Sequence, residues 1–128
     1  MVVAGEGLPS ADFLTGLSDP YVKIHLTSVQ AQNSEGPRPL PIVHSFRTET
    51  IRNTLTPEWN ESFILTPFNL EDQLLLECWD WDLVGDDDIL GSMQCQIGDV
   101  IDHCDGRDRW YPLHGHNGHD SGKVRVSE

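Results

Sequence analysis

Aspartates crowd one short stretch of the chain. The segment from 77 to 92 reads ECWDWDLVGDDDILGS, and five aspartates fall within its nine positions 80–88, with no Lys or Arg among them. Carboxylates about 4 Å apart repel each other by roughly 1 kcal/mol in water and by about 4 kcal/mol at an effective dielectric near 20. Such a cluster is strained unless a cation joins it or water screens it.

The ligand chemistry of this segment favours calcium. Carboxylate oxygens are hard ligands, and Ca²⁺ accepts six to eight oxygens in flexible geometry, whereas Mg²⁺ requires a tight octahedron and Zn²⁺ prefers His or Cys. The segment is not an EF-hand, because Val84 occupies loop position five and Gly91 occupies position twelve. The alternative is an acidic, solvated hairpin tip that binds no ion.

A strand must lead into this acidic loop. Leu74, Leu76 and Cys78 alternate with residues of the other face, which predicts a strand with one buried side. Period-two alternation carries Asp80 and Asp82 beyond its end on one side of the chain. A turn at Gly85 then brings residues 86–88 back towards them.

A second acidic segment precedes another predicted strand. Asp12 and Asp19 lie in a turn-rich connection, and Pro20 holds Asp19 in extended geometry. Residues 21–26 alternate, with Val22, Ile24 and Leu26 on one face. The ligands of a metal ion are therefore expected to come from both acidic loops.

The rest of the chain is predicted to form short strands separated by turns. The further expected strands are 1–4, 46–51, a strand after Pro57 with Trp59, Glu61, Phe63 and Leu65 on one face, 91–97, a short strand at Trp110, Tyr111 and Leu113, and 122–127 with Val124 and Val126 inward. Residues 5–16 are expected to connect strands, 27–45 to form an extended surface loop and 99–103 one helical turn. About eight strands at this spacing predict an all-β fold, an antiparallel β-sandwich.

Composition limits the classes of function. A net charge of −13 with only eight Lys and Arg argues against nucleic-acid binding. Three cysteines in no paired pattern indicate reduced thiols and a cytoplasmic compartment. We expect one domain over residues 1–128, monomeric in isolation, without signal peptide or membrane span, and excised from a larger protein because it begins within a strand.

Two further motifs, one rich in proline and one in histidine, are interpreted as loops. The prolines of PRPLP at 37–41 never form PxxP, so we interpret the segment as a loop. The histidines of HGHNGH at 114–119 lie between glycines and are interpreted as a solvated loop. The sequence contains no nucleophile elbow, phosphate loop or zinc hydrolase motif, so we do not expect an enzyme.

Several motifs in order resemble the C2 domain family, calcium-dependent phospholipid-binding modules built on an eight-stranded β-sandwich. The motifs are LPSAD at 8–12, GLSDPYVKI at 16–24, NTLTPEWNESF at 53–63, WDWDLVGDDDILGS at 79–92 and Trp110-Tyr111. The order of strands is similar to the second, phospholipase-like of the two permuted topologies of that family.

The resemblance implies a ligand set and two or three calcium ions. By motif position the ligands are Asp12, Asp19, Asp80, Asp82 and Asp88, with the carboxylate of Asp86 and the backbone carbonyls of Ala11 and Trp81 as further candidates. Asp12 and Asp19 are seven residues apart, whereas the family spacing is usually six. We interpret the difference as one inserted residue within 13–15; the alternative is that Phe13 occupies the ligand position.

The resemblance also implies peripheral, calcium-triggered binding to an anionic phospholipid membrane. The candidate membrane-contact residues are Phe13, Leu14, Leu83 and Val84, which could instead pack within their own loops. A phosphoinositide patch is disfavoured because Glu49 lies between Arg47 and Arg52. The alternative function is a calcium-independent protein-protein interaction module.

Overall fold

The computed structural model describes residues 2–8, 18–28, 42–64, 71–83, 85–101, 109–115 and 120–126. In this part of the chain it contains eight strands and one short helix. They are β1 (Val2–Glu6), β2 (Pro20–Thr27), β3 (Ile42–Arg47), β4 (Glu58–Glu61), β5 (Gln73–Asp80), β6 (Asp88–Gln96), α1 (Ile97–Ile101), β7 (Arg109–His114) and β8 (Asp120–Val126).

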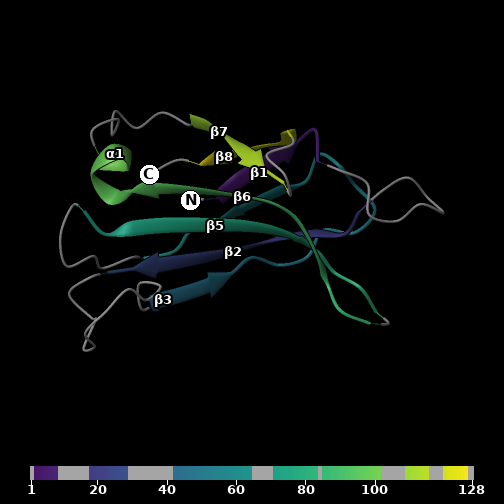
Figure 1. Ribbon diagram of the computed structural model, residues 1–128. Coiled ribbons are helices and arrows are strands. Elements are labelled where there is room, and N and C mark those ends of the chain that lie inside the picture. The colour runs from purple at the N-terminus through teal and green to yellow at the C-terminus, as the bar shows by residue number, and fades with distance from the viewer. Residues whose placement is uncertain are drawn as a thin grey trace.

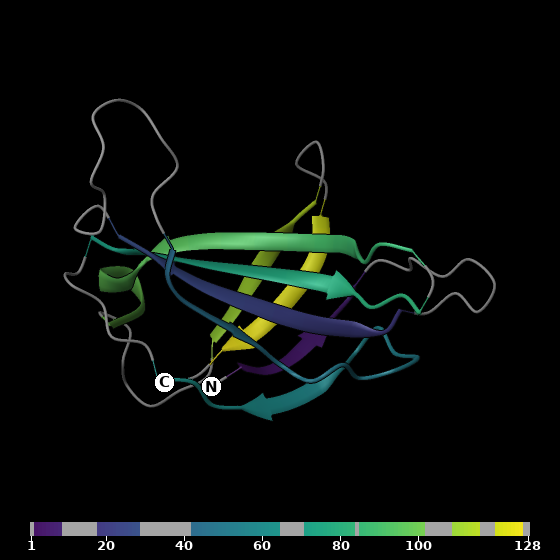
Figure 2. The same cartoon turned by 90° about the horizontal axis from the view of Figure 1, so that it is seen from below.

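The strands form one curled antiparallel sheet in the order β3-β2-β5-β6-β7-β8-β1-β4. A single register pair, Ser92 with His114, joins β6 to β7, whereas β5 and β6 pair along their whole length. The sheet folds over at this junction, so that β3-β2-β5-β6 lies across β7-β8-β1-β4 (Figures 1 and 2). The predicted all-β antiparallel fold is confirmed, while the assignment to the phospholipase-like topology stays a prediction.

The core lies between the two layers and follows the alternation of β2 and β5. Every second residue of these strands is buried, with Leu26 fully buried and Leu76 only 1% exposed. Trp59 from β4 and Val124 from β8 complete the core from the other layer. Phe46 and Phe63, with ring centroids 5.3 Å apart, pack against each other beside β3 and β4.

Two glycines allow close approaches around β8. A Cβ at Gly91 in β6 would lie 2.8 Å from the Cβ of Ser121. Gly122 has φ +85°, and a Cβ there would lie 2.5 Å from the carbonyl oxygen of Glu6. Side chains at either position would force the strands apart.

The third strand differs most from expectation. Residues 42–45 belong to β3 rather than to the predicted 27–45 loop, and β3 ends at Arg47 instead of continuing to 51. The strand stops there because the Thr48 hydroxyl oxygen, and not a backbone carbonyl, accepts the Val22 N–H at 2.9 Å. Residues 29–41, including PRPLP, lie outside the described residues.

Other element boundaries differ from the predicted ones by a few residues. The expected strand at 1–4 continues to Glu6, β6 begins at Asp88 instead of 91, and β8 begins at Asp120 instead of 122. The helix spans 97–101 rather than 99–103, because Ile97 is buried and its N–H donates to the Asp72 carbonyl at 2.8 Å. β4 ends at Glu61, next to Asn60 at φ +51°.

The described cysteines are not in disulfides. Cys78 is buried and Cys95 half-buried, and both thiols are free; Cys104 lies outside the described residues. Burial raises the pKa of Cys78 to about 12 and that of Cys95 to about 11. Among the described residues, no helix has the length and apolarity needed to cross a membrane.

Candidate functional site

Asp19, the described end of the second acidic segment, meets the β5–β6 acidic segment at one end of the sandwich, opposite helix α1 (Figures 1 and 2). Pro20 at the start of β2 pairs with Asp80 at the end of β5. The N–H of Asp19 donates to Oδ1 of Asp80 at 2.7 Å, and the N–H of Trp81 donates to the carbonyl of Asp19 at 2.9 Å. The structure thus brings together aspartates that are 61 residues apart in the sequence.

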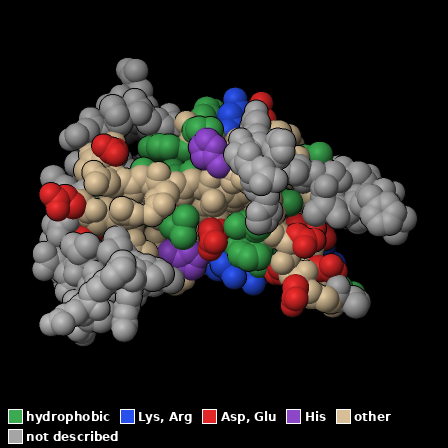
Figure 3. Space-filling model, in the orientation of Figure 1, with side chains coloured by type: hydrophobic (Ala, Val, Ile, Leu, Met, Phe, Trp, Pro, Cys, Tyr) green, Lys and Arg blue, Asp and Glu red, His purple; other side chains and the backbone are tan. Residues whose placement is uncertain are grey.

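The remaining described candidates surround this contact. Asp88 begins β6 and pairs directly with Asp80, so both residues end strands rather than lying within the loop. Asp80 is only 7% exposed, whereas Asp82, Asp86 and Asp88 are exposed. Figure 3 shows Asp and Glu side chains gathered at this end, over the connection between β5 and β6.

The electrostatics of Asp80 reflect this crowding. Its pKa is raised above the ordinary value, first by burial and then by the charges of Asp19, Asp88 and Asp82. The hydrogen bond from the Asp19 N–H acts in the opposite direction and only partly offsets these effects. A cation at this end would relieve the repulsion.

A third segment, which the sequence interpretation did not include, holds Asp19 in place. The N–H of Asn53 donates to Oδ1 of Asp19 at 2.7 Å, and the N–H of Thr54 donates to the Ser18 carbonyl at 2.8 Å. Asn53 has φ +56°, a left-handed conformation that Asn tolerates better than most residues. Asn53, the first residue of the 53–63 motif, was the feature of the sequence that could have indicated this turn.

Sequence analysis also did not predict a separate role for Asp87, because it is one of three adjacent aspartates. Its Oδ2 accepts a hydrogen bond from the Tyr21 hydroxyl, and its Oδ1 accepts one from the Asp82 N–H at 2.9 Å. The bond from Tyr21 lowers the pKa of Asp87. Burial, followed by this same bond, raises the pKa of Tyr21 to about 12.

The donor set suits a hard cation, although the described residues do not by themselves form a closed ligand cluster. Among the described residues, no group of three or more His, Cys, Asp or Glu side chains is placed to hold a metal ion. Asp12 and Ala11 lie outside those residues. Asp88 pairs directly with Asp80, and Asp82 and Asp88 are both exposed to solvent.

The membrane-contact candidates are described at one position only. Leu83, at the tip of the β5–β6 connection, is 80% exposed and therefore does not pack within its own loop. Phe13, Leu14 and Val84 lie outside the described residues. Beside the tip, the Arg52 guanidinium lies 4.8 Å from the ring centroid of Trp81.

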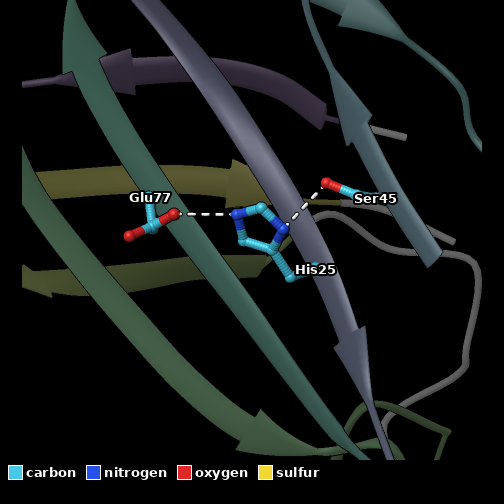
Figure 4. A network of polar contacts seen from close by, with 3 residues as sticks. All are labelled: His25, Ser45 and Glu77. Carbon is cyan, nitrogen blue, oxygen red and sulfur yellow. Dashed lines mark hydrogen bonds and ion pairs between the residues drawn. The ribbon is translucent and has the colours of Figure 1, made fainter. Parts of the chain in front are cut away.

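The outer face of β3, β2 and β5 carries basic residues that already have partners. Arg47 lies 3.7 Å from the ring centroid of Tyr21, and Lys23 lies 4.7 Å from that of Trp79. His25 bridges Glu77 and Ser45 through its two ring nitrogens, at 2.8 Å each (Figure 4).

Comparison with known proteins gives consistent matches. The family model described as C2 domain matches residues 1–113. The chain is 37% identical over 99 residues to arrestin domain-containing protein B of Dictyostelium discoideum (75% of this chain, 14% of that protein). It is 34% identical over 112 residues to human synaptotagmin-9 (85% of this chain, 20% of that protein). The chain thus spans a small part of these relatives.

Solved structures agree in fold. A C2 domain of plant extended synaptotagmin 1 has a TM-score of 0.74 at 23% identity, covering 97% of this chain and 85% of that one. The two C2 domains of extended synaptotagmin 2, in a calcium-bound structure, give a TM-score of 0.67 at 24% identity, covering 98% of this chain and 43% of that one.

Proposed function

Because the chain belongs to the C2 domain family, we propose that it binds anionic phospholipid membranes in a calcium-dependent manner through the acidic end of its sandwich. Its C2 relatives support a membrane-binding module. The observation that carries calcium dependence is the meeting of Asp19 and Asp88 at Asp80, whose pKa is raised by burial and then by the charges of these neighbours. This arrangement costs free energy until a cation neutralises it.

The residues that would hold calcium come from both acidic segments. They are the carboxylates of Asp12, Asp19, Asp80, Asp82 and Asp88, with Asp86 and the carbonyls of Ala11 and Trp81 as further ligands for two or three ions. Bound calcium would supply positive charge and coordination positions for lipid phosphate or carboxylate oxygens. The hard oxygen donors favour calcium, and a structural neighbour, extended synaptotagmin 2, has been solved in a calcium-bound form.

The attraction to the membrane must be local. Two or three ions would change the net charge from −13 to between about −9 and −7, so the domain as a whole remains repelled by an anionic bilayer. Charges beyond a Debye length of about 8 Å are screened at physiological salt. Binding therefore depends on groups at the loops themselves.

The exposed tip supplies an apolar contribution. Leu83 is 80% exposed, and burying apolar groups in the bilayer contributes about 0.8 kcal/mol per CH₂. We propose that Phe13, Leu14 and Val84 contribute with it. The domain would then be a cytoplasmic monomer that becomes a peripheral membrane protein when calcium rises.

Liposome flotation tests this function. The domain is mixed with phosphatidylserine–phosphatidylcholine or pure phosphatidylcholine vesicles in millimolar calcium, magnesium or chelator. Flotation only with calcium and phosphatidylserine is expected. Equal flotation in chelator, or none under any condition, would contradict the proposal, and the latter would favour the calcium-independent protein-interaction module.

A further inference from the structure

Asp87 has a different environment from the exposed aspartates around it. It is half-buried, whereas Asp82, Asp86 and Asp88 are exposed. Each of its two carboxylate oxygens accepts a hydrogen bond from the protein, one from the Tyr21 hydroxyl and one from the Asp82 backbone N–H. Its carboxylate thus links strand β2 to the β5–β6 connection.

The strand side of this link is rigid. Tyr21 is 1% exposed, and its backbone pairs with Trp79 of β5. The guanidinium of Arg47 lies 3.7 Å from the centre of its ring. A ring packed in this way keeps its hydroxyl in one place, so the O–H group that donates to Asp87 is held in a fixed position.

The loop side of the link is the part that needs support. Asp82 and Leu83 are exposed, and few apolar contacts hold such a connection in one conformation. The bond from the Asp82 N–H to Asp87 fixes the backbone of a candidate ligand. Ligands that are ordered before binding lose less conformational entropy when an ion arrives.

We propose that Tyr21 and Asp87 are positioning residues, which together hold the β5–β6 connection, and Asp82 in particular, in a conformation ready to bind calcium. This inference rests on the proposed function. In this role Asp87 acts through its hydrogen bonds and is not itself a ligand. The sequence alone does not distinguish a ligand from a positioning residue here, because Asp86, Asp87 and Asp88 are adjacent and chemically identical.

Tyr21→Phe removes only the hydroxyl and keeps the packed ring. Ser28→Ala is a matched control, since it removes another hydroxyl–aspartate bond, 2.6 Å to Asp72, just beyond the other end of β2. By calorimetry we expect Tyr21→Phe to weaken calcium binding about tenfold, or 1.4 kcal/mol, and Ser28→Ala to leave it unchanged. Equal calcium affinity in Tyr21→Phe and parent would overturn the inference.

Two variants at Asp87 distinguish a positioning residue from a calcium ligand. Asp87→Asn keeps an oxygen for the Asp82 N–H and an amide that can bond the Tyr21 oxygen, whereas Asp87→Ala removes both contacts. If Asp87 is a positioning residue, we expect Asp87→Ala to weaken calcium binding about tenfold and Asp87→Asn to weaken it by less than about threefold. Equal, large losses in both variants would assign Asp87 as a ligand and overturn the proposal.

Hydrogen exchange supplies a readout without calcium. In chelator, the Asp82 amide should exchange faster in Tyr21→Phe than in the parent, and at the parental rate in Ser28→Ala. Unchanged exchange in Tyr21→Phe would overturn the inference even if the parent binds calcium. If the parent binds no calcium, the proposed function fails. Faster exchange of the Asp82 amide in Tyr21→Phe would then show only that Tyr21 and Asp87 order the β5–β6 connection.

Discussion

Replacing Asp80 by Asn should stabilise the calcium-free protein and remove most of its response to calcium. Asp80 is 7% exposed, and its pKa is raised by burial and by the charges of Asp19, Asp88 and Asp82. Asparagine has nearly the same shape, and its oxygen can still accept the Asp19 N–H. The substitution thus removes a negative charge that destabilises the calcium-free fold. The same charge would coordinate bound calcium.

The magnitude follows from the repulsion between neighbouring carboxylates. One such pair at about 4 Å costs between about 1 kcal/mol in water and about 4 kcal/mol at a dielectric near 20. Because Asp82 and Asp88 are exposed to solvent, the lower value applies, and we expect a gain of about 1 kcal/mol. For a domain of this size that raises the Tm by about 3–6 °C.

The pH dependence has a definite sign. A carboxylate whose folded pKa is raised binds its proton more tightly in the folded state, so Asp80 stabilises the calcium-free fold as pH falls through that pKa. Above it, the ionised group lowers stability. The gain from Asp80→Asn should therefore be largest at pH 7 and shrink towards pH 4.

Thermal melts in chelator and in millimolar calcium, at pH 4 to 7.5, test this reasoning. Asp99→Asn on α1, at the opposite end of the sandwich, removes the same charge from an exposed site and serves as the control. A lower Tm of Asp80→Asn in chelator at pH 7 would refute the electrostatic account. A full calcium response in the same variant would refute its role as a ligand.

The remaining predictions use the same domain. Calcium at 100 times its Kd should stabilise the fold by about 2.7 kcal/mol, magnesium far less, and Asp82→Asn should lose most of this shift; an undiminished shift in that variant would remove Asp82 from the ligand set. Leu83→Ala should leave stability within about 0.5 kcal/mol but weaken liposome binding in 0.5 M salt about fivefold, because apolar burial is not screened; identical binding would show that the tip does not insert. Cys78, with a pKa of about 12, should resist alkylation at pH 8 until the protein unfolds, and peptide mapping that finds it modified in the folded protein would contradict its burial. Gly122→Ala should destabilise the fold by about 1–3 kcal/mol in denaturant titrations, since φ is +85° and the Glu6 carbonyl blocks a Cβ; parental stability would mean that β1 and β8 can separate there without cost.

Alternation predicted the strands that bury one face. In β2 and β5 the apolar residues recur at every second position, and the structure buries them as expected, with Leu74, Leu76 and Cys78 all inside. Such strands are readable from sequence because the solvent side is polar and the core side is not. The same pattern predicted Asp80 just beyond the strand, whereas the structure makes it the last residue of β5.

Strand ends and connections were less readable because tertiary contacts decide them. β3 stops where the Thr48 hydroxyl takes the place of a backbone carbonyl, a choice that depends on a partner 26 residues away. The helix start depends on the Asp72 carbonyl that receives the Ile97 N–H. Neither contact leaves a periodic signal in the local sequence.

Within the candidate site, residue types were predictable and roles were not. Carboxylate chemistry predicted that two acidic segments meet, and the resemblance to the C2 family named Asp19, Asp80 and Asp88 among the ligands. In the structure Asp80 pairs with Asp88 and accepts the Asp19 N–H. The separate role of Asp87 depends on Tyr21, which is 66 residues away. The support from Asn53 depends on a left-handed backbone that the sequence permits but does not require.

The register of the core strands determines where the acidic site can form. Asp80 continues the buried face of Leu74, Leu76 and Cys78, so its side chain reaches the rim of the core instead of the outer surface. A slip of one residue in β5 would turn every core leucine to solvent and would move Asp80 to the opposite face. The free energy that holds the leucines inside therefore also holds this charge in its unfavourable place. A cluster maintained in this way can stay strained without calcium, because relaxing it would require the core to unpack.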